Sequence, residues 1–247
     1  MTKSIMFIGD TIPAWWESLK SQQDSYTFTE HTTRQGVIST LVDIRPAVIL
    51  IDGDGDLFWC TAPKSNPATR RLPLFAIGHT TNALHAGADL ILSPTELLKD
   101  APNLLQNFIR EVDTEQLACD CARPLPALAQ QGIEQFNKGE YYKQHDSFEA
   151  LWVNTDSPVR DLYRAILQVG VAYYQITRGN YRGAYKMLLR SVQWLTVLPD
   201  VCQGIDVAAL RADSAQVRAA LDALSQDEIT QFDKTLLQPI KLVKTSG

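Results

Sequence analysis

Apolar residues in the first 110 positions gather in short runs that are separated by helical patterns. The runs are SIMFIG, YTFTE, PAVILID, PLFAIG and ADLILS. Strands of a parallel sheet carry apolar runs of this kind because helices cover both faces of the sheet. The pattern therefore predicts an α/β unit over residues 1–110, built on a doubly wound, parallel, five-stranded sheet.

A helical period of 3.6 residues replaces the strand pattern after residue 111. The stretch EVDTEQLACDCARPLP contains two prolines and mixed polarity, so residues 111–125 are expected to form a linker. Residues 126–240 predict an all-α helical bundle. The expected helices cover residues 126–138, 140–153, 158–178, 181–197, 207–223 and 226–237.

Composition narrows the range of partners. The chain of 247 residues is 45% hydrophobic and 21% charged, as is typical of a globular protein, and its formal charge is -5. An acidic chain is a poor match to a broad phosphate-binding surface, so we expect no nucleic-acid partner. No apolar run reaches the length of a signal-peptide core or a membrane span, so we expect a cytoplasmic protein with no membrane partner.

The four cysteines are Cys60, Cys119, Cys121 and Cys202, and they lack the paired spacing of a metal finger. In a reducing cytosol they are expected to be free thiols. Cys119 and Cys121 form a Cys-x-Cys motif, which leaves redox activity or metal binding open as an alternative to a plain surface linker.

The stretch HDSFEALW puts polar side chains where a helix would normally be apolar. His145, Glu149 and Trp152 fall on one helix face at positions i, i+4 and i+7. A weak repeat at a spacing of forty residues relates FNKGEYYKQHDSFEALW to ITRGNYRGAYKMLLRSV, and there Tyr185 and Leu189 replace His145 and Glu149. Packing in the repeat therefore does not require polar residues at these positions, which favours a functional role.

A second polar stripe follows on the next expected helix. Arg160, Arg164 and Gln168 occupy positions i, i+4 and i+8, and they can face His145 and Glu149. Three interpretations remain: a buried structural polar network, a pocket for a ligand or partner, and a catalytic centre. A divalent metal is a further option, but two ligands are too few for zinc and the other histidines lie in the first unit.

Polar residues also follow the expected strands of the first unit. Asp10 comes after the first strand, Asp52 ends the third, Thr80 follows the fourth, and Ser93 precedes Pro94 after the fifth. This arrangement resembles the receiver domain of two-component response regulators, a flavodoxin-like fold. In that family an aspartate at the position of Asp52 is phosphorylated, and an acidic pair after the first strand holds magnesium.

The resemblance to a receiver is incomplete. Asp10 follows Gly9, so half of the acidic pair is missing, and Ser93 stands where the family has a lysine. Without that lysine the fixed positive charge that responds to phosphorylation is lost. The resemblance therefore implies a pseudo-receiver with a regulatory or docking role, while phosphoryl or metal chemistry at Asp52 stays open as an alternative.

The second unit resembles the bacterial family called domain of unknown function 309, a small all-helical module, over about residues 131–222. The resemblance is carried by FNKGEYYKQHDSFEALW, RDLYRAILQVGVAYYQITRGN and GIDVAAL. The matching residues are Asn137, Gly139, Glu140, His145, Glu149, Trp152, Arg160, Gln168, Gly179 and Asn180. Asp146 replaces a glutamate of the family pattern, and Arg164 stands where glutamine is common.

Together these patterns predict a non-enzymatic regulatory or adaptor protein, in which a pseudo-receiver is coupled to a helical module. We expect the module to bind a protein partner, a second copy of the chain or a small ligand, and we expect no cofactor. Two alternatives are kept: an acid–base or metal-assisted enzyme centred on His145 and Glu149, and a receiver that is phosphorylated at Asp52.

Overall fold

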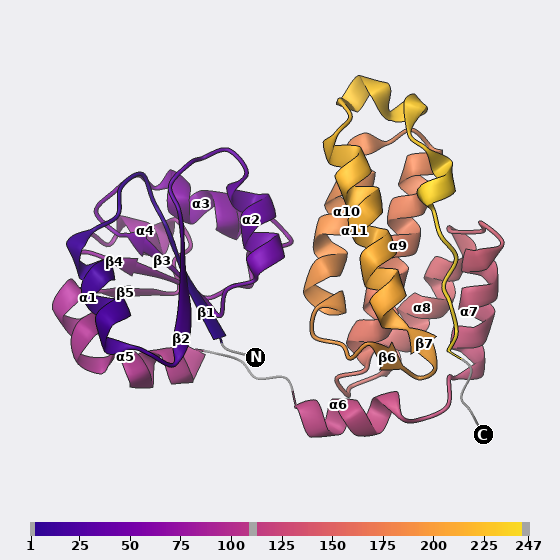
Figure 1. The fold of residues 1–247 in the computed structure, drawn as a ribbon, viewed down its shortest axis with the longest axis horizontal. Coiled ribbons are helices and arrows are strands. Elements are labelled where there is room, and N and C mark those ends of the chain that lie inside the picture. The colour runs from indigo at the N-terminus through magenta and orange to yellow at the C-terminus, as the bar shows by residue number, and fades with distance from the viewer. Residues whose placement is uncertain (1–2, 109–112, 244–247) are drawn as a thin grey trace. The chain divides into compact units, whose positions relative to one another are not determined.

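The computed structural model describes residues 3–108 and 113–243. The chain divides into two units, residues 1–110 and residues 111–247 (Figure 1). Among the helices of the described segments, none combines the length and the apolar character needed to span a membrane.

The first unit is a five-stranded parallel sheet with the strand order β2-β1-β3-β4-β5. This confirms the predicted doubly wound α/β fold. Its elements are β1 (Lys3–Ile8), α1 (Ala14–Gln22), β2 (Tyr26–His31), α2 (Val37–Ile44), β3 (Val48–Asp52), α3 (Phe58–Ser65), β4 (Leu74–Ile77), α4 (Asn82–His85), β5 (Leu90–Leu92) and α5 (Pro94–Phe108).

Both faces of the sheet are buried, which explains the apolar runs in the sequence. Alternate residues of β1, β3 and β4 belong to two separate cores, because successive side chains of a strand point to opposite faces. Leu41 and Trp59 bring α2 and α3 into one core, whereas Trp16 and Leu97 bring α1 and α5 into the other. Because all five strands run in the same direction, their carboxyl ends meet at one edge of the sheet. Ligands of doubly wound folds bind at this edge.

The second unit is helical, as predicted, and α9 lies at its centre. Its elements are α6 (Thr114–Cys121), α7 (Ala127–Asn137), α8 (Lys143–Asn154), α9 (Arg160–Thr177), α10 (Tyr181–Leu195), β6 (Val201–Cys202), β7 (Ile205–Asp206), α11 (Val207–Asp222), η1 (Gln226–Gln231) and η2 (Lys234–Leu236). Helix α9 packs against both α8 and α10, and most of its residues from Leu162 to Tyr173 are buried.

Helices α8 and α9 approach each other closely at Gly170. A Cβ atom on Gly170 would lie 2.2 Å from Nε2 of Gln144, so any side chain here would displace that residue. Gln144 is fully buried, and its Nε2 donates to the carbonyl of Tyr141 at 3.0 Å and to that of Leu167 at 3.5 Å. The glycine therefore lets one buried amide connect the two helices.

Three parts of the second unit differ from the predicted elements. Residues 114–121, inside the expected linker, form α6, whose first turn is capped by Asp113 through the amide of Gln116 at 2.9 Å. A two-stranded antiparallel hairpin, β6–β7, interrupts the helices, because Gln203 and Gly204 adopt the positive φ angles of a tight turn. The helix expected over residues 226–237 is replaced by the short 3₁₀ segments η1 and η2.

The expectation of four free thiols is wrong, because Cys121 and Cys202 form a disulfide. These cysteines are 81 residues apart, so their spacing contains no signal of the pairing. The backbone N–H of Gln203 also donates to the carbonyl of Cys121 at 2.7 Å, which joins α6 to the hairpin. Cys60 is buried and Cys119 is exposed, and both are free. The bonded state of Cys121 removes the thiolate pair that a Cys-x-Cys metal site would need.

Breaking the disulfide is expected to lower the free energy of unfolding of the helical unit. Reduction, or the substitution Cys202→Ser, should cost about 3 kcal/mol, because the unfolded chain regains the entropy of a long open loop. Urea unfolding with and without dithiothreitol measures the difference. The matched control is Cys119→Ser, which removes an exposed thiol two residues from the disulfide. Equal stability in the two redox states would contradict the expectation.

Candidate functional site

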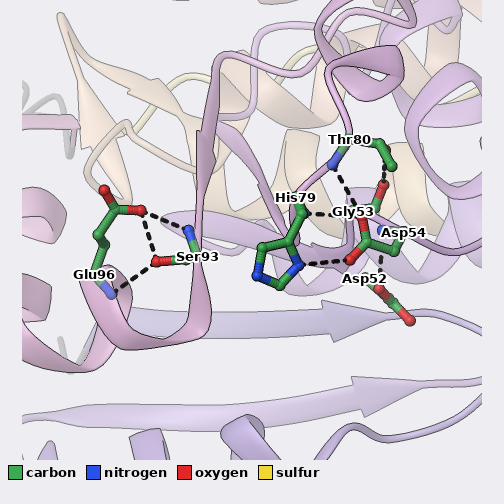
Figure 2. A network of polar contacts seen from close by, with 7 residues as sticks. All are labelled: Asp52, Gly53, Asp54, His79, Thr80, Ser93 and Glu96. Atoms are coloured by element: carbon green, nitrogen blue, oxygen red, sulfur yellow. Dashed lines mark hydrogen bonds and ion pairs between the residues drawn. The ribbon is translucent and has the colours of Figure 1, made fainter.

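The acidic loop after β3 is attached to the loop after β4 through Asp54. Its Oδ1 accepts hydrogen bonds from the backbone N–H groups of His79 at 2.8 Å and Thr80 at 3.0 Å, and its Oδ2 lies 3.1 Å from Nδ1 of His79 (Figure 2). The His79 N–H is the main cause of a lowered pKa of the Asp54 carboxyl, and the His79 ring adds to it. Two adjacent backbone donors thus hold the carboxylate, in the way that such donors bind anions generally.

Two of the predicted receiver residues, Asp52 and Thr80, lie beside Asp54 in this network. Oδ1 of Asp52 accepts from the backbone N–H of Asp54 at 3.0 Å, and the Thr80 hydroxyl donates to the carbonyl of Gly53 at 2.9 Å (Figure 2). A Cβ atom on Gly78 would lie 2.8 Å from Cγ of Asp54, so the close contact of the two loops requires glycine there. The polar groups of the two loops are therefore bonded mainly to each other.

The other two predicted receiver residues serve different contacts. Oδ1 of Asp10 lies 3.9 Å from Nε of Arg34, whose Nη2 is 2.5 Å from Oδ2 of Asp56. Ser93 begins α5 as half of a capping box. Its N–H and hydroxyl donate to Oε2 of Glu96 at 2.8 and 2.7 Å, and the Glu96 N–H donates to the Ser93 hydroxyl at 3.2 Å (Figure 2).

Asp54 is the residue of this edge whose contacts the sequence did not predict. The alternation of aspartate and glycine from Asp52 to Asp56 was the available signal, since aspartates in such runs accept hydrogen bonds from nearby backbone. The partner amides lie 25 and 26 residues further along the chain, and only the folded sheet brings them to Asp54.

The second candidate site is a pocket of about 220 Å³ between α8, α9 and α10. Five of the seven predicted residues line it, whereas Asp146 and Arg160 do not, and the Asp146 side chain is 85% exposed. The lining residues are His145, Glu149, Trp152, Arg164, Leu167, Gln168, Val171, Met187 and Arg190.

Arg164 is held between two tryptophans at this pocket. Its Cζ lies 4.5 Å from the ring centroid of Trp152 and 4.0 Å from that of Trp194, so the guanidinium makes a cation–π contact with each indole. Nε1 of Trp194 donates to Oε1 of Gln168 at 3.1 Å, and Gln168 is only 4% exposed. A buried hydrogen bond therefore orients one of the two rings that the Arg164 guanidinium contacts.

His145 and Glu149 form the more open part of the pocket wall. Nδ1 of His145 lies 3.8 Å from Oε2 of Glu149 and 3.5 Å from Oδ1 of Asp146. The side chains of His145 and Glu149 are 34% and 51% exposed. The polar network is thus buried at Gln168 and Trp194 and open to solvent at His145 and Glu149. Within the described segments, no three His, Cys, Asp or Glu side chains come together as a group that could hold a metal ion.

The α10 contribution to the pocket was missed from the sequence. Met187, Arg190 and Trp194 stand at i, i+3 and i+7 and therefore share one helix face. Their spacing was a usable signal, but their types are common in ordinary helix packing. Only the contact of α10 with α9 distinguishes this face from the others.

Comparison with known proteins bears on the helical unit. Residues 129–187 match the family described as Domain of unknown function (DUF309). The match begins in α7 and ends at Met187, so it includes the α8 and α9 walls of the pocket. No match to the chain was found among curated proteins.

Removing the Asp54 charge is expected to destabilise the first unit at neutral pH. The substitution Asp54→Asn should cost about 1 kcal/mol, because it weakens hydrogen bonds from backbone N–H groups to a partly exposed anion. A lowered carboxyl pKa stabilises the fold above the ordinary carboxyl pKa, and this contribution is lost as the pH falls through the lowered value. The difference between wild type and variant should therefore be seen at pH 7 and disappear in acid.

Urea unfolding at several pH values measures this difference. The control is Asp24→Asn, which removes an exposed carboxylate from the same unit. An Asp54→Asn variant as stable as Asp24→Asn at pH 7 would show that the loop contact contributes nothing.

Proposed function

We propose that the protein is a non-enzymatic regulatory protein, in which a receiver-like unit acts by docking and is coupled to a helical unit that binds a ligand or a protein partner. The proposal assigns no phosphoryl transfer to Asp52. It treats the pocket between α8, α9 and α10 as a binding site.

The Asp54 carboxylate is the observation that carries this proposal. A phosphoryl group on Asp52 would bring further negative charge and three acceptor oxygens that need donors. The amides of His79 and Thr80 already donate to Asp54, and the Thr80 hydroxyl already donates to Gly53. A phosphoryl group would therefore compete with a carboxylate of the same chain for these donors, and would also be repelled by it.

The residue after β5 supports the same conclusion. Ser93 stands where a receiver would offer a lysine, and its hydroxyl is bonded to the carboxylate of Glu96 at 2.7 Å. Glu96 adds a negative charge near the edge at which a phosphoryl dianion would have to be held. The electrostatics of this edge consequently favour a permanent internal network over a reversible modification.

Exposed apolar side chains support a docking role for the receiver-like unit. Ile12 follows β1, Leu57 follows β3, and Leu84 lies in α4 after β4, and all three are exposed. They stand in segments that leave the carboxyl edge of the sheet. Apolar side chains exposed in such segments are available for contact with another protein.

The pocket supports binding rather than catalysis in the helical unit. The Arg164 guanidinium contacts the rings of Trp152 and Trp194, and an arginine stacked on aromatic rings suits recognition of a ligand group. His145 and Glu149 are separated by 3.8 Å and are partly exposed to solvent. A general acid or base usually requires a closer hydrogen bond and a less solvated environment.

The proposal is tested first at Asp52. Incubation of the full chain with acetyl phosphate and Mg²⁺, followed by intact-mass measurement, should show no added phosphoryl group. A phosphoryl mass that appears in the wild type and is lost in Asp52→Asn would overturn the proposal in favour of an active receiver.

The enzyme alternative has a separate test. In a broad hydrolase screen, wild type and His145→Ala should be equally inactive, because the proposal gives His145 no role in chemistry. An activity that is present in the wild type and lost in His145→Ala, with the variant still folded, would establish the enzyme instead.

A further inference from the structure

We infer that the Cys121–Cys202 disulfide is a redox switch, which a dithiol reductant opens to release α6 from the rest of the helical unit. The inference goes beyond the proposed function, because it concerns the attachment of α6 and neither the pocket nor the edge of the sheet. Three observations carry it: the few contacts that hold α6, a buried oxygen of Asp120 and the partly exposed position of Cys121.

Helix α6 is attached to the helical unit near its C-terminal end. Leu117 and Asp120 are the buried ones among its eight residues, and β6 is the element that α6 contacts most (Figure 1). The disulfide joins Cys121 to β6, and the carbonyl of Cys121 accepts from the N–H of Gln203 at 2.7 Å. Nε2 of Gln203 donates to the carbonyl of Asp120 at 3.4 Å. A short helix held mainly by one apolar side chain and two hydrogen bonds can open locally while the core stays folded.

The burial of Asp120 opposes the attachment of α6. Its Oδ1 accepts from Nε2 of Gln116 at 3.0 Å and lies 3.3 Å from Nη1 of Arg123. Its Oδ2 is buried and has no hydrogen-bond partner among the described residues. This oxygen gains hydrogen bonds to water when α6 leaves, and that gain is of the same order as the lost burial of Leu117. The noncovalent attachment is therefore nearly balanced, and the disulfide determines whether α6 stays.

The reaction that opens the switch is a thiol–disulfide exchange. Cys121 is partly exposed whereas Cys202 is fully buried, so a thiolate of the reductant attacks Sγ of Cys121. Sγ of Cys202 leaves and takes a proton. The second thiol of the reductant then attacks the mixed disulfide and releases the Cys121 thiol, and the reductant becomes a cyclic disulfide. Two electrons and two protons thus pass to the protein, and exchange with an oxidised dithiol reverses the reaction.

Release of α6 changes the connection between the two units. Helix α6 is the first described helix of the second unit, and it follows α5 along the chain. Once released, its residues join the segment that links α5 to α7. The redox state of one bond therefore sets the length of the connection between the receiver-like unit and the pocket helices.

Hydrogen–deuterium exchange of the full chain, measured by mass spectrometry, tests the switch. Dithiothreitol should reduce the disulfide without denaturant, as alkylation of the thiols would show. The amides of α6 should then exchange about tenfold faster, while those of α9 change by less than about twofold. Reduction that requires denaturant, an unchanged rate in α6, or equal acceleration in α9 would each overturn the inference.

Two cysteine variants connect the effect to this bond. Without reductant, Cys202→Ser should show the fast α6 exchange of the reduced wild type. Cys119→Ser keeps the disulfide and should respond to dithiothreitol as the wild type does. Slow exchange of α6 in Cys202→Ser, or loss of the response in Cys119→Ser, would overturn the inference.

A third variant protects the test against misfolding, because it should strengthen the attachment of α6. Asp120→Leu replaces the carboxyl, whose Oδ2 lacks a partner among the described residues, by an apolar group of similar shape. In the reduced variant the amides of α6 should exchange about tenfold more slowly than in the reduced wild type, which a damaged fold would not produce. An equal or faster rate would overturn the inference, since the buried oxygen would then not be what allows α6 to leave.

Discussion

The close approach of α8 and α9 is the constraint on which the helical unit depends. At Gly170 the two helices are near enough for the Gln144 side chain of α8 to donate to the Leu167 carbonyl of α9, as it also does to the Tyr141 carbonyl just before α8. Near the other end of α8, Trp152 contacts the Arg164 guanidinium of α9. Both residues line the pocket, and all of its lining residues that the structure describes belong to α8, α9 and α10. The walls of the pocket are therefore helices that also form the core.

In the first unit, close packing of two loops determines the structure at the carboxyl edge of the sheet. Parallel strands bring several loops together, and the backbone donors in those loops need acceptors. Asp54 provides an acceptor from within the chain, and Gly78 leaves the space for it. A fold that commonly places a ligand or a cofactor at this edge here completes the edge with its own side chain. The docking partner that we propose would therefore contact the surface around the network rather than the network itself.

Features with a local sequence pattern could be predicted, whereas contacts between residues far apart in the chain could not. The apolar runs predicted the sheet, because burial on two faces leaves a local signature, and helical spacing placed His145, Glu149 and Trp152 on one wall of the pocket. The position of Arg190 in the pocket was not predicted, because the sequence does not show which face of α10 packs against α9. Asp54 was missed for the same reason, since its donors belong to a different loop.

The pairing of Cys121 with Cys202 is the clearest contact that the sequence could not predict. Spacing allowed no inference about two residues that meet only after the hairpin β6–β7 folds back towards α6. The short length of this hairpin also explains why it was not expected, since two-residue strands leave no alternating pattern in the sequence. The long helices α7 to α11 were predicted, whereas the helix expected over residues 226–237 was wrong and the brief connecting elements depended on contacts that a linear pattern does not contain.

The disulfide has a mechanical consequence for the whole chain. Helices α7, α8, α9 and α10 all lie between Cys121 and Cys202, so the crosslink closes a covalent loop around the pocket helices. Tension applied between the first unit and the C-terminal end would pass from Cys121 directly to Cys202. The helices that build the pocket would then lie outside the path of the load, and the pocket would keep its shape while the rest of the chain was stretched.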